Sequence, residues 1–207
     1  MKKEDIGIVI LAAGASTRLG RPKQLLNFEG KTLIKRIADT AISTGLDTVV
    51  VLGSNATDIK KEVENLSVEI VINPNWGNGM GSSIKVGLQK SLKIQPDLSG
   101  VILLLCDQPF ITKDTISCLL KTKSESAKSI VACRYGDTIG TPAFFTNEIF
   151  EELLNLEDNT GAKPLIEKYK DTNISLLSAP EAAFDIDTQE DFLRLTGAQA
   201  PCLHRTR

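Results

Sequence analysis

A loop of small residues carrying two basic side chains follows the first apolar run of the chain. Residues 11–23 read Leu-Ala-Ala-Gly-Ala-Ser-Thr-Arg-Leu-Gly-Arg-Pro-Lys. Small residues let backbone N–H groups approach an anion closely, and Arg18 and Lys23 can add positive charge against phosphate oxygens. The spacing fits neither a Walker A loop nor the GxGxxG dinucleotide fingerprint. The loop predicts an anion site, and the simpler alternative is a glycine turn with a solvated arginine and lysine.

Three aspartates stand where they could hold a divalent cation. Asp107 directly follows the apolar run 101–106, so it should face the crevice beyond the carboxyl end of a strand. Asp185 and Asp187 are two residues apart in an extended segment, so they share a face, where their charges repel unless a cation lies between them or solvent screens them. Mg²⁺ takes one or two such carboxylates together with phosphates and water. The alternatives are a helix cap for Asp107 and an Asx-turn at a strand end for the pair.

A second glycine-rich loop covers residues 73–84 and places Gly77, Gly79 and Gly81 within five positions. Glycines this close together imply that the backbone approaches something flat or charged. Ser82 or Ser83 is expected to cap the helix that follows, whose N-terminus can itself bind an anion. The alternative is a turn and a cap that bind no ligand.

Short apolar runs separated by helical patterns must position these loops. Nearly continuous apolar runs, typical of parallel strands covered on both faces, occur at residues 6–12, 48–52, 68–72 and 101–106. Further strands are expected at 129–134 and 174–177, and helices at 32–43, 55–65, 82–91, 112–123, 147–155, 163–168 and 188–195. This alternation predicts an α/β fold: a three-layer, Rossmann-like, mostly parallel sheet with helices on both faces. Residues 136–161 are expected to form a small antiparallel excursion or lid, in one domain over 1–197 followed by a loose tail at 198–207.

The composition narrows the possible functions. The 207 residues carry 24 Lys and Arg against 26 Asp and Glu, a net charge of −2 that predicts neither nucleic acid nor membrane as a partner. Four scattered cysteines do not form a disulfide framework, and a single histidine, His204, argues against a zinc site or a Ser-His-Asp triad. Acidic residues interrupt the basic N-terminus and no apolar run is long enough to span a membrane, which favours a cytoplasmic location.

The pattern AAGxSxRxGxxKxLL at residues 12–26 resembles the signature of small nucleotidyltransferases with the nucleotide-diphospho-sugar transferase fold. Within them it is most similar to the molybdenum cofactor cytidylyltransferase group, because residues 22–26 depart from the guanylyltransferase branch. The resemblance covers nearly the whole chain.

The resemblance also implies roles for individual residues. The nucleotide would contact Leu11, Ala12, Ala13, Gly14, Lys23, Gly79, Gly81 and Ser82. The catalytic residues would be Arg18, Lys23 and Asp107, and the ligands of Mg²⁺ would be Asp107, Asp187 and, as a close alternative to Asp187, Asp185. The acceptor would contact Gly140, Thr141, Pro142 and Lys163.

The implied reaction is transfer of CMP from CTP to the phosphate of molybdopterin, with release of pyrophosphate. The attacking phosphate is ionised at neutral pH, so catalysis depends on positioning and charge neutralisation rather than on a strong base. A molybdoenzyme apoprotein would be a further partner. GTP as the donor, or a sugar or alcohol phosphate as the acceptor, stays open within the same chemistry. A non-catalytic molybdenum cofactor-binding accessory protein and a glycosyltransferase are alternatives of other classes.

Overall fold

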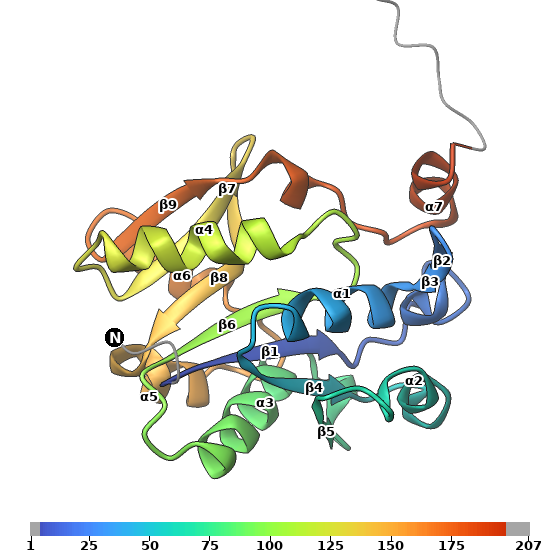
Figure 1. The fold of residues 1–207 in the computed structure, drawn as a ribbon, viewed down its shortest axis with the longest axis horizontal. Helices are drawn as coiled ribbons and strands as arrows, with labels where there is room; N and C mark the ends of the chain where they lie inside the picture. Colours follow the sequence, from blue (N-terminus) through green and yellow to red (C-terminus); the bar gives the residue numbers. More distant parts are fainter. Residues whose placement is uncertain (1–4, 198–207) are drawn as a thin grey trace, which may run out of the picture.

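A seven-stranded sheet in the order β5-β4-β1-β6-β8-β7-β9 forms the centre of the computed structural model, which describes residues 5–197 (Figure 1). The strands are β1 Ile6–Ala12, β4 Asp47–Leu52, β5 Glu69–Ile72, β6 Gly100–Leu105, β7 Ile130–Tyr135, β8 Thr138–Thr146 and β9 Ile174–Ser178. β1 lies between β4 and β6 and runs parallel to both, and β5 extends this parallel half of the sheet. The predicted α/β fold with a mostly parallel sheet is confirmed.

Helices cover both faces of the sheet, which gives three layers. The helices are α1 Leu33–Ile42, α2 Ala56–Val63, α3 Met80–Ile94, α4 Lys113–Ser124, α5 Phe150–Leu154, α6 Lys163–Tyr169 and α7 Gln189–Leu195. Alternate residues of β1 face opposite sides: Ile8 and Ile10 pack in one apolar cluster with α1, α2 and α4. Val9 and Leu11 pack in a second cluster with α3, α5 and α6. All seven residues of β1 are buried, as its continuous apolar sequence predicts.

The edge strand β5 departs from the expectation of a strand buried on both faces. Its two central residues are half-buried and its two end residues are exposed, with Ile72 54% exposed. The strand pairs with β4 alone because it is the last strand on that side of the sheet. Three of its four residues are apolar, so the apolar run in the sequence did not distinguish this edge strand from a central strand.

The segment expected to form an antiparallel excursion or lid is built into the sheet. β8 lies between β6 and β7 and is antiparallel to both, with a register shift between Ala132 and Cys133 of β7. It contributes Phe144 and Phe145, both fully buried, to the two faces of the core. The antiparallel character is confirmed, but β8 is a full strand of the sheet and not a lid over it.

A small two-stranded sheet and a short helix lie beyond the carboxyl end of β1. The two-stranded hairpin of β2 (Asn27–Phe28) and β3 (Lys31–Thr32) lies beside α7 in Figure 1. A third apolar cluster joins them, with Leu26, Leu33 and Ile186 buried and Phe28 and Phe192 packed against it. This cluster brings the segment before α7 next to the loop that follows β1.

Two helix starts follow their sequence signals closely. Thr112 begins α4 and Thr188 begins α7, each with a reciprocal capping box.

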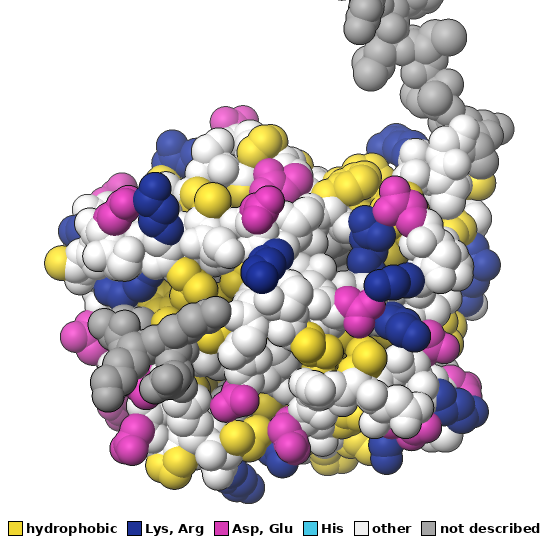
Figure 2. Space-filling view, in the orientation of Figure 1, with side chains coloured by type: hydrophobic (Ala, Val, Ile, Leu, Met, Phe, Trp, Pro, Cys, Tyr) yellow, Lys and Arg dark blue, Asp and Glu magenta, His cyan; other side chains and the backbone are white. Residues whose placement is uncertain are grey.

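No helix within residues 5–197 is both long enough and apolar enough to cross a membrane. On the face shown in Figure 2, basic and acidic side chains are interspersed rather than separated into fields of one sign. His204 and the expected tail at 198–207 lie outside the described residues.

Candidate active site

A cavity of about 290 Å³ opens at the carboxyl ends of β1 and β6. Loops that follow parallel strands meet at this edge of an α/β sheet, which is where such folds bind ligands. The cavity is lined by Leu11, Ala12, Ala13, Gly14, Ala15, Lys23, Gln24, Trp76, Gly77, Gly79, Met80, Ser83, Leu105, Cys106 and Asp107. Of the residues predicted from sequence to bind nucleotide or act in catalysis, the structure thus brings together seven: Leu11, Ala12, Ala13, Gly14, Lys23, Gly79 and Asp107.

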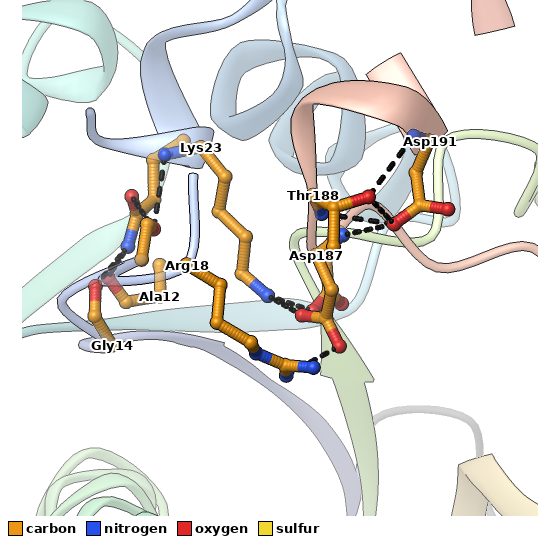
Figure 3. A network of polar contacts seen from close by, with 10 residues as sticks. Ala12, Gly14, Arg18, Lys23, Asp187, Thr188 and Asp191 are labelled. Carbon is orange, nitrogen blue, oxygen red and sulfur yellow. Dashed lines mark hydrogen bonds and ion pairs between the residues drawn. The ribbon is translucent and has the colours of Figure 1, made fainter. Parts of the chain in front are cut away.

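An ion-pair network lies at one side of this strand-end cavity. The Lys23 Nζ atom is 2.5 Å from Asp107 Oδ2 and 2.9 Å from Asp187 Oδ1. A nitrogen of the Arg18 guanidinium is 2.8 Å from Asp187 Oδ2. Figure 3 shows Arg18 and Lys23 reaching from the loop after β1 toward Asp187. Four of the residues expected to hold phosphate or metal therefore meet, although they lie far apart in the sequence.

The network shifts the pKa values of its members according to burial and charge. Burial alone would lower the pKa of Lys23, but Asp107 and Asp187 outweigh it and raise that pKa above its ordinary value. Burial would raise the pKa of Asp187, but the hydrogen bonds and charges of Lys23 and Arg18 bring it below its ordinary value. Lysine and aspartate thus both stay charged at neutral pH.

Asp185 has a different environment from Asp187. The residue as a whole is exposed, yet partial burial of its carboxyl group and the nearby charges of Asp107 and Asp187 raise its pKa. Arg18 and Lys23 make their ion pairs with Asp187 rather than with Asp185. The role of either aspartate as a metal ligand stays a prediction.

The residues present are suited to a divalent cation that also contacts a phosphate. Among residues 5–197 no group of three or more His, Cys, Asp or Glu side chains could hold a metal alone. Asp107 Oδ1, however, is buried and has no hydrogen-bond partner, so this carboxylate has an unused acceptor at the cavity. Because Mg²⁺ needs only one or two carboxylates when phosphates and water complete its shell, the donor set fits such an ion.

The glycine-rich loop before α3 owes part of its composition to a neighbouring loop. A Cβ atom on Gly81 would lie 2.2 Å from the Glu157 carbonyl oxygen, and one on Gly79 would lie 2.5 Å from the Asp158 carbonyl oxygen. The Gly81 N–H donates to that Asp158 oxygen at 3.0 Å. Close packing against residues 157–160 therefore explains why side chains are excluded at both positions.

Gly81 and Ser82 were expected to contact the nucleotide, and their role in binding it stays a prediction. Neither residue lines the strand-end cavity. Ser82 is buried, where its hydroxyl accepts a hydrogen bond from Asn73 Nδ2 at 2.8 Å and donates to the Gly79 carbonyl. α3 begins at Met80 after Gly79, with no side-chain cap, so the expected cap by Ser82 or Ser83 is wrong. Ser83, one residue further, lines the cavity instead.

The expected acceptor residues fall into two places. The Thr141 carbonyl accepts a hydrogen bond from Gln108 Nε2 at 3.1 Å, which ties the segment of Gly140, Thr141 and Pro142 to the residue after Asp107. Gln108 Nε2 also donates to the Ala182 carbonyl at 2.9 Å. Lys163 is exposed at the first position of α6. Acceptor binding by these residues stays a prediction.

Sequence reasoning gave no role to Gln24, which the structure places inside the site. Its side chain is fully buried, and Nε2 donates to the carbonyl oxygens of Ala12 at 2.9 Å and Gly14 at 2.8 Å. The only signal in the sequence was a polar residue next to Lys23 and just before the apolar pair Leu25-Leu26, and the burial that gives it importance appears only in the structure. Lys23 and Gln24 belong to a single 3₁₀ turn over Lys23–Leu25, so one local structure holds both side chains.

Comparison with known proteins agrees with this geometry. Residues 8–172 match the family model of the MobA-like NTP transferase domain. A probable molybdenum cofactor guanylyltransferase of Bacillus anthracis is 30% identical over 151 residues, which are 72% of each chain. A nicotine blue oxidoreductase of Paenarthrobacter nicotinovorans is 38% identical over 114 residues, and the match spans only about half (54%) of either chain.

Solved structures resemble the chain over nearly its whole length. Rv0371c from Mycobacterium tuberculosis H37Rv is 28% identical with a TM-score of 0.80, over 95% of this chain and 100% of that one. A structure of Rv0371c in complex with manganese is similar with a TM-score of 0.75 and 27% identity, over 94% of this chain and 100% of that one. The fold is therefore shared with a protein that has been crystallised with manganese.

Proposed function

Because the chain belongs to the MobA-like NTP transferase family, we propose that it transfers CMP from CTP to the phosphate of a molybdopterin-type acceptor and releases pyrophosphate. The observation that carries the proposal is the convergence of Arg18, Lys23, Asp107 and Asp187 beside a loop-lined cavity. Two cations and two carboxylates beside one cavity suit a substrate that brings both phosphates and a divalent metal.

In this proposal the acceptor phosphate attacks the α-phosphorus of the NTP, and the bond from that phosphorus to the bridging oxygen of pyrophosphate breaks. Lys23 and Arg18 hold the triphosphate and balance the charge that pyrophosphate carries away. Asp107 and Asp187 would hold Mg²⁺, which neutralises charge on the α-phosphate when it is bound. The attacking oxygen is already ionised, so no side chain has to remove a proton from it.

In this proposal the nucleotide binds in the strand-end cavity. Leu11, Ala12, Ala13 and Gly14 form one wall and Gly79 belongs to the other, where Trp76 and Ser83 also lie. Trp76 is still 36% exposed, so its indole ring is available to a flat ligand. In this proposal Gly140, Thr141, Pro142 and Lys163 bind the acceptor. A molybdoenzyme apoprotein is the partner that would receive the product.

GTP is the main alternative to CTP as the nucleotide donor, because a relative that matches 72% of the chain is a probable guanylyltransferase. The segment 22–26, which departs from the guanylyltransferase branch, favours CTP. Titrating wild type and Asp107→Ala with each of four NTPs and Mg²⁺ by calorimetry tests the choice. Selective CTP binding that is lost in the variant would support the proposal. Selective GTP binding would replace the donor but keep the chemistry, and binding of no NTP would overturn the proposed function.

A second candidate is an oxidoreductase, favoured by the 38% identity to nicotine blue oxidoreductase. The loop after β1 lacks the GxGxxG spacing of an ordinary dinucleotide site. Titration with NADH and NADPH, followed by the fluorescence of the single tryptophan, Trp76, separates the two candidates. Tight binding of a reduced dinucleotide without magnesium would favour this candidate. Pyrophosphate release that needs magnesium would favour nucleotidyl transfer and argue against a non-catalytic accessory protein.

A further inference from the structure

The buried amide of Gln24 fastens the loop after β1 at three points. Nε2 donates to the carbonyl oxygens of Ala12 and Gly14, which Figure 3 labels at the start of the loop. Oε1 accepts from the hydroxyl of Ser16 at 3.5 Å, and that hydroxyl in turn accepts from the Lys23 N–H at 3.0 Å. Two carbonyl acceptors can be met only by the NH₂ end of an amide, so these contacts determine the orientation of the side chain.

Fixing the carbonyls also fixes the backbone donors of the loop. The carbonyl between those two, of Ala13, accepts from the Ser54 N–H at 3.0 Å. Three successive carbonyls, at residues 12 to 14, are therefore held by other parts of the protein. A planar trans peptide directs its N–H opposite to its C=O. The N–H groups of Ala13, Gly14 and Ala15 consequently point away from Gln24 and Ser54.

The loop so held forms a wall of the strand-end cavity. Ala12, Ala13, Gly14 and Ala15 all line it. A Cβ atom on Gly14 would meet nothing within 4 Å, so the space beside this residue is open. Backbone N–H groups in a loop of small residues are suited to bind phosphate oxygens.

We propose that Gln24 is a positioning residue, which holds residues 12–16 so that the N–H groups of Ala13, Gly14 and Ala15 bind the phosphates of the NTP. This inference rests on the proposed function. In it, the Gln24 side chain orders the phosphate-binding backbone without contacting the substrate itself. Because Gln24 and Lys23 are neighbours in one 3₁₀ turn, the same turn supplies a phosphate-binding charge and the support for the backbone donors.

Two substitutions separate this role from general packing. Gln24→Met keeps the length of the side chain but removes both hydrogen-bond donors. Gln24→Glu keeps length, shape and an oxygen for Ser16, and it also loses the donors to the two carbonyls. The matched control is Leu98→Ala, which removes a buried side chain (3% exposed) that contacts Gly7, near the amino end of the sheet. If Gln24→Met does not fold, Gln24→Glu alone gives the answer.

The probes are inorganic tripolyphosphate and CTP, each with Mg²⁺, in calorimetry and in pyrophosphate-release kinetics, with melting temperature measured alongside. Both Gln24 variants should bind tripolyphosphate at least tenfold more weakly and show a KM for CTP raised at least tenfold, with a smaller change in kcat. Leu98→Ala should lower the melting temperature and leave both affinities unchanged. Wild-type affinities in the Gln24 variants, or an equal loss in Leu98→Ala, would overturn the inference alone. Failure of the wild type to bind either probe or any other NTP would overturn the proposed function and this inference together.

Discussion

The Lys23 ammonium group bridges two carboxylates, at 2.5 Å from Asp107 Oδ2 and 2.9 Å from Asp187 Oδ1. Lys23 and Asp107 are 84 residues apart in the sequence, and Asp187 is 164 residues from Lys23, so the fold alone brings the three together. Only 15% of the Lys23 side chain and 14% of the Asp107 side chain are exposed. A cation is therefore built into the place where the proposed reaction needs positive charge, and it must share its contacts with any phosphate that binds.

Replacing that cation should stop turnover. Lys23→Met removes the charge but keeps most of the volume of the side chain, and we expect kcat/KM for the NTP to fall about 100- to 1,000-fold, as for loss of one electrostatic donor in a preorganised site. Pyrophosphate release, measured where circular dichroism shows the variant to be folded, checks this. Lys61→Met is the control, since Lys61 pairs with Asp58 on α2 and both side chains are 64% exposed. Equal rates for the two variants would contradict a role for Lys23.

The same substitution should also affect stability. Without the ammonium group, the mostly buried Asp107 loses its ion pair, while Asp187 keeps its ion pair with Arg18. Lys23→Met is expected to lower the melting temperature, and the double variant Lys23→Met/Asp107→Asn should recover part of it because one negative charge is gone. No recovery in the double variant would mean that packing, rather than charge, sets the loss.

Gly14→Ala tests whether the open space beside the first loop belongs to the nucleotide. The added methyl group meets no protein atom within 4 Å, so the free energy of unfolding should change by less than about 0.5 kcal/mol. If phosphates occupy that space, the affinity for NTP should fall at least tenfold. Calorimetry on the folded variant measures this. Unchanged affinity would place the nucleotide elsewhere.

Gly81→Ala is the opposite of Gly14→Ala, because its added methyl group would clash with protein atoms. Its methyl group would lie 2.2 Å from the backbone oxygen of Glu157, so either α3 or the loop at 157–160 has to move. We expect a loss of about 1–3 kcal/mol in the free energy of unfolding, typical of overpacking. Because Gly81 does not line the cavity, any loss of NTP affinity should follow the loss of stability and be relieved at lower temperature.

Thiol reactivity reports on the packing of the sheet. Burial is the main cause that raises the pKa of Cys133 to about 12, with the charge of Glu181 adding to it. At pH 8 only on the order of one Cys133 thiol in 10⁴ is then a thiolate. Cys118 on α4 is exposed. Alkylation with N-ethylmaleimide at pH 8, followed by peptide mass spectrometry, should modify Cys118 long before Cys133, and similar rates would show that β7 opens readily.

Much of the fold could be predicted because its signals are local. The buried strands β1, β4 and β6 are continuous apolar runs, and the capping threonines Thr112 and Thr188 mark the starts of α4 and α7. β8 could not be predicted in the same way. Gly140 and Pro142 interrupt its sequence, and its place between β6 and β7 depends on pairing with strands distant in the chain.

The residues of the candidate site could be predicted where a charged side chain follows a strand of the sheet. Lys23 lies in the segment after β1 and Asp107 follows β6, and both line the cavity at the carboxyl ends of these strands. Gly81 and Ser82 were also expected to bind the ligand, and the structure shows local contacts that the sequence did not indicate: a neighbouring loop packs against Gly81, and the buried Asn73 donates to Ser82. Gln24 carries no motif by itself, and its importance appears only once the carbonyls of Ala12 and Gly14 are seen around it.

The most direct test of the central claim is the product of the reaction. Wild type and Asp107→Asn would be incubated with CTP, Mg²⁺ and a molybdopterin-type acceptor, and the products analysed by mass spectrometry together with pyrophosphate release. Nucleotidyl transfer predicts one pyrophosphate for each acceptor that gains CMP in the wild type. It also predicts a rate at least 100-fold lower in Asp107→Asn, with only a small change in melting temperature. Pyrophosphate or product formation that is equal in the two proteins, or an acceptor that gains no nucleotide from any NTP, would contradict the account.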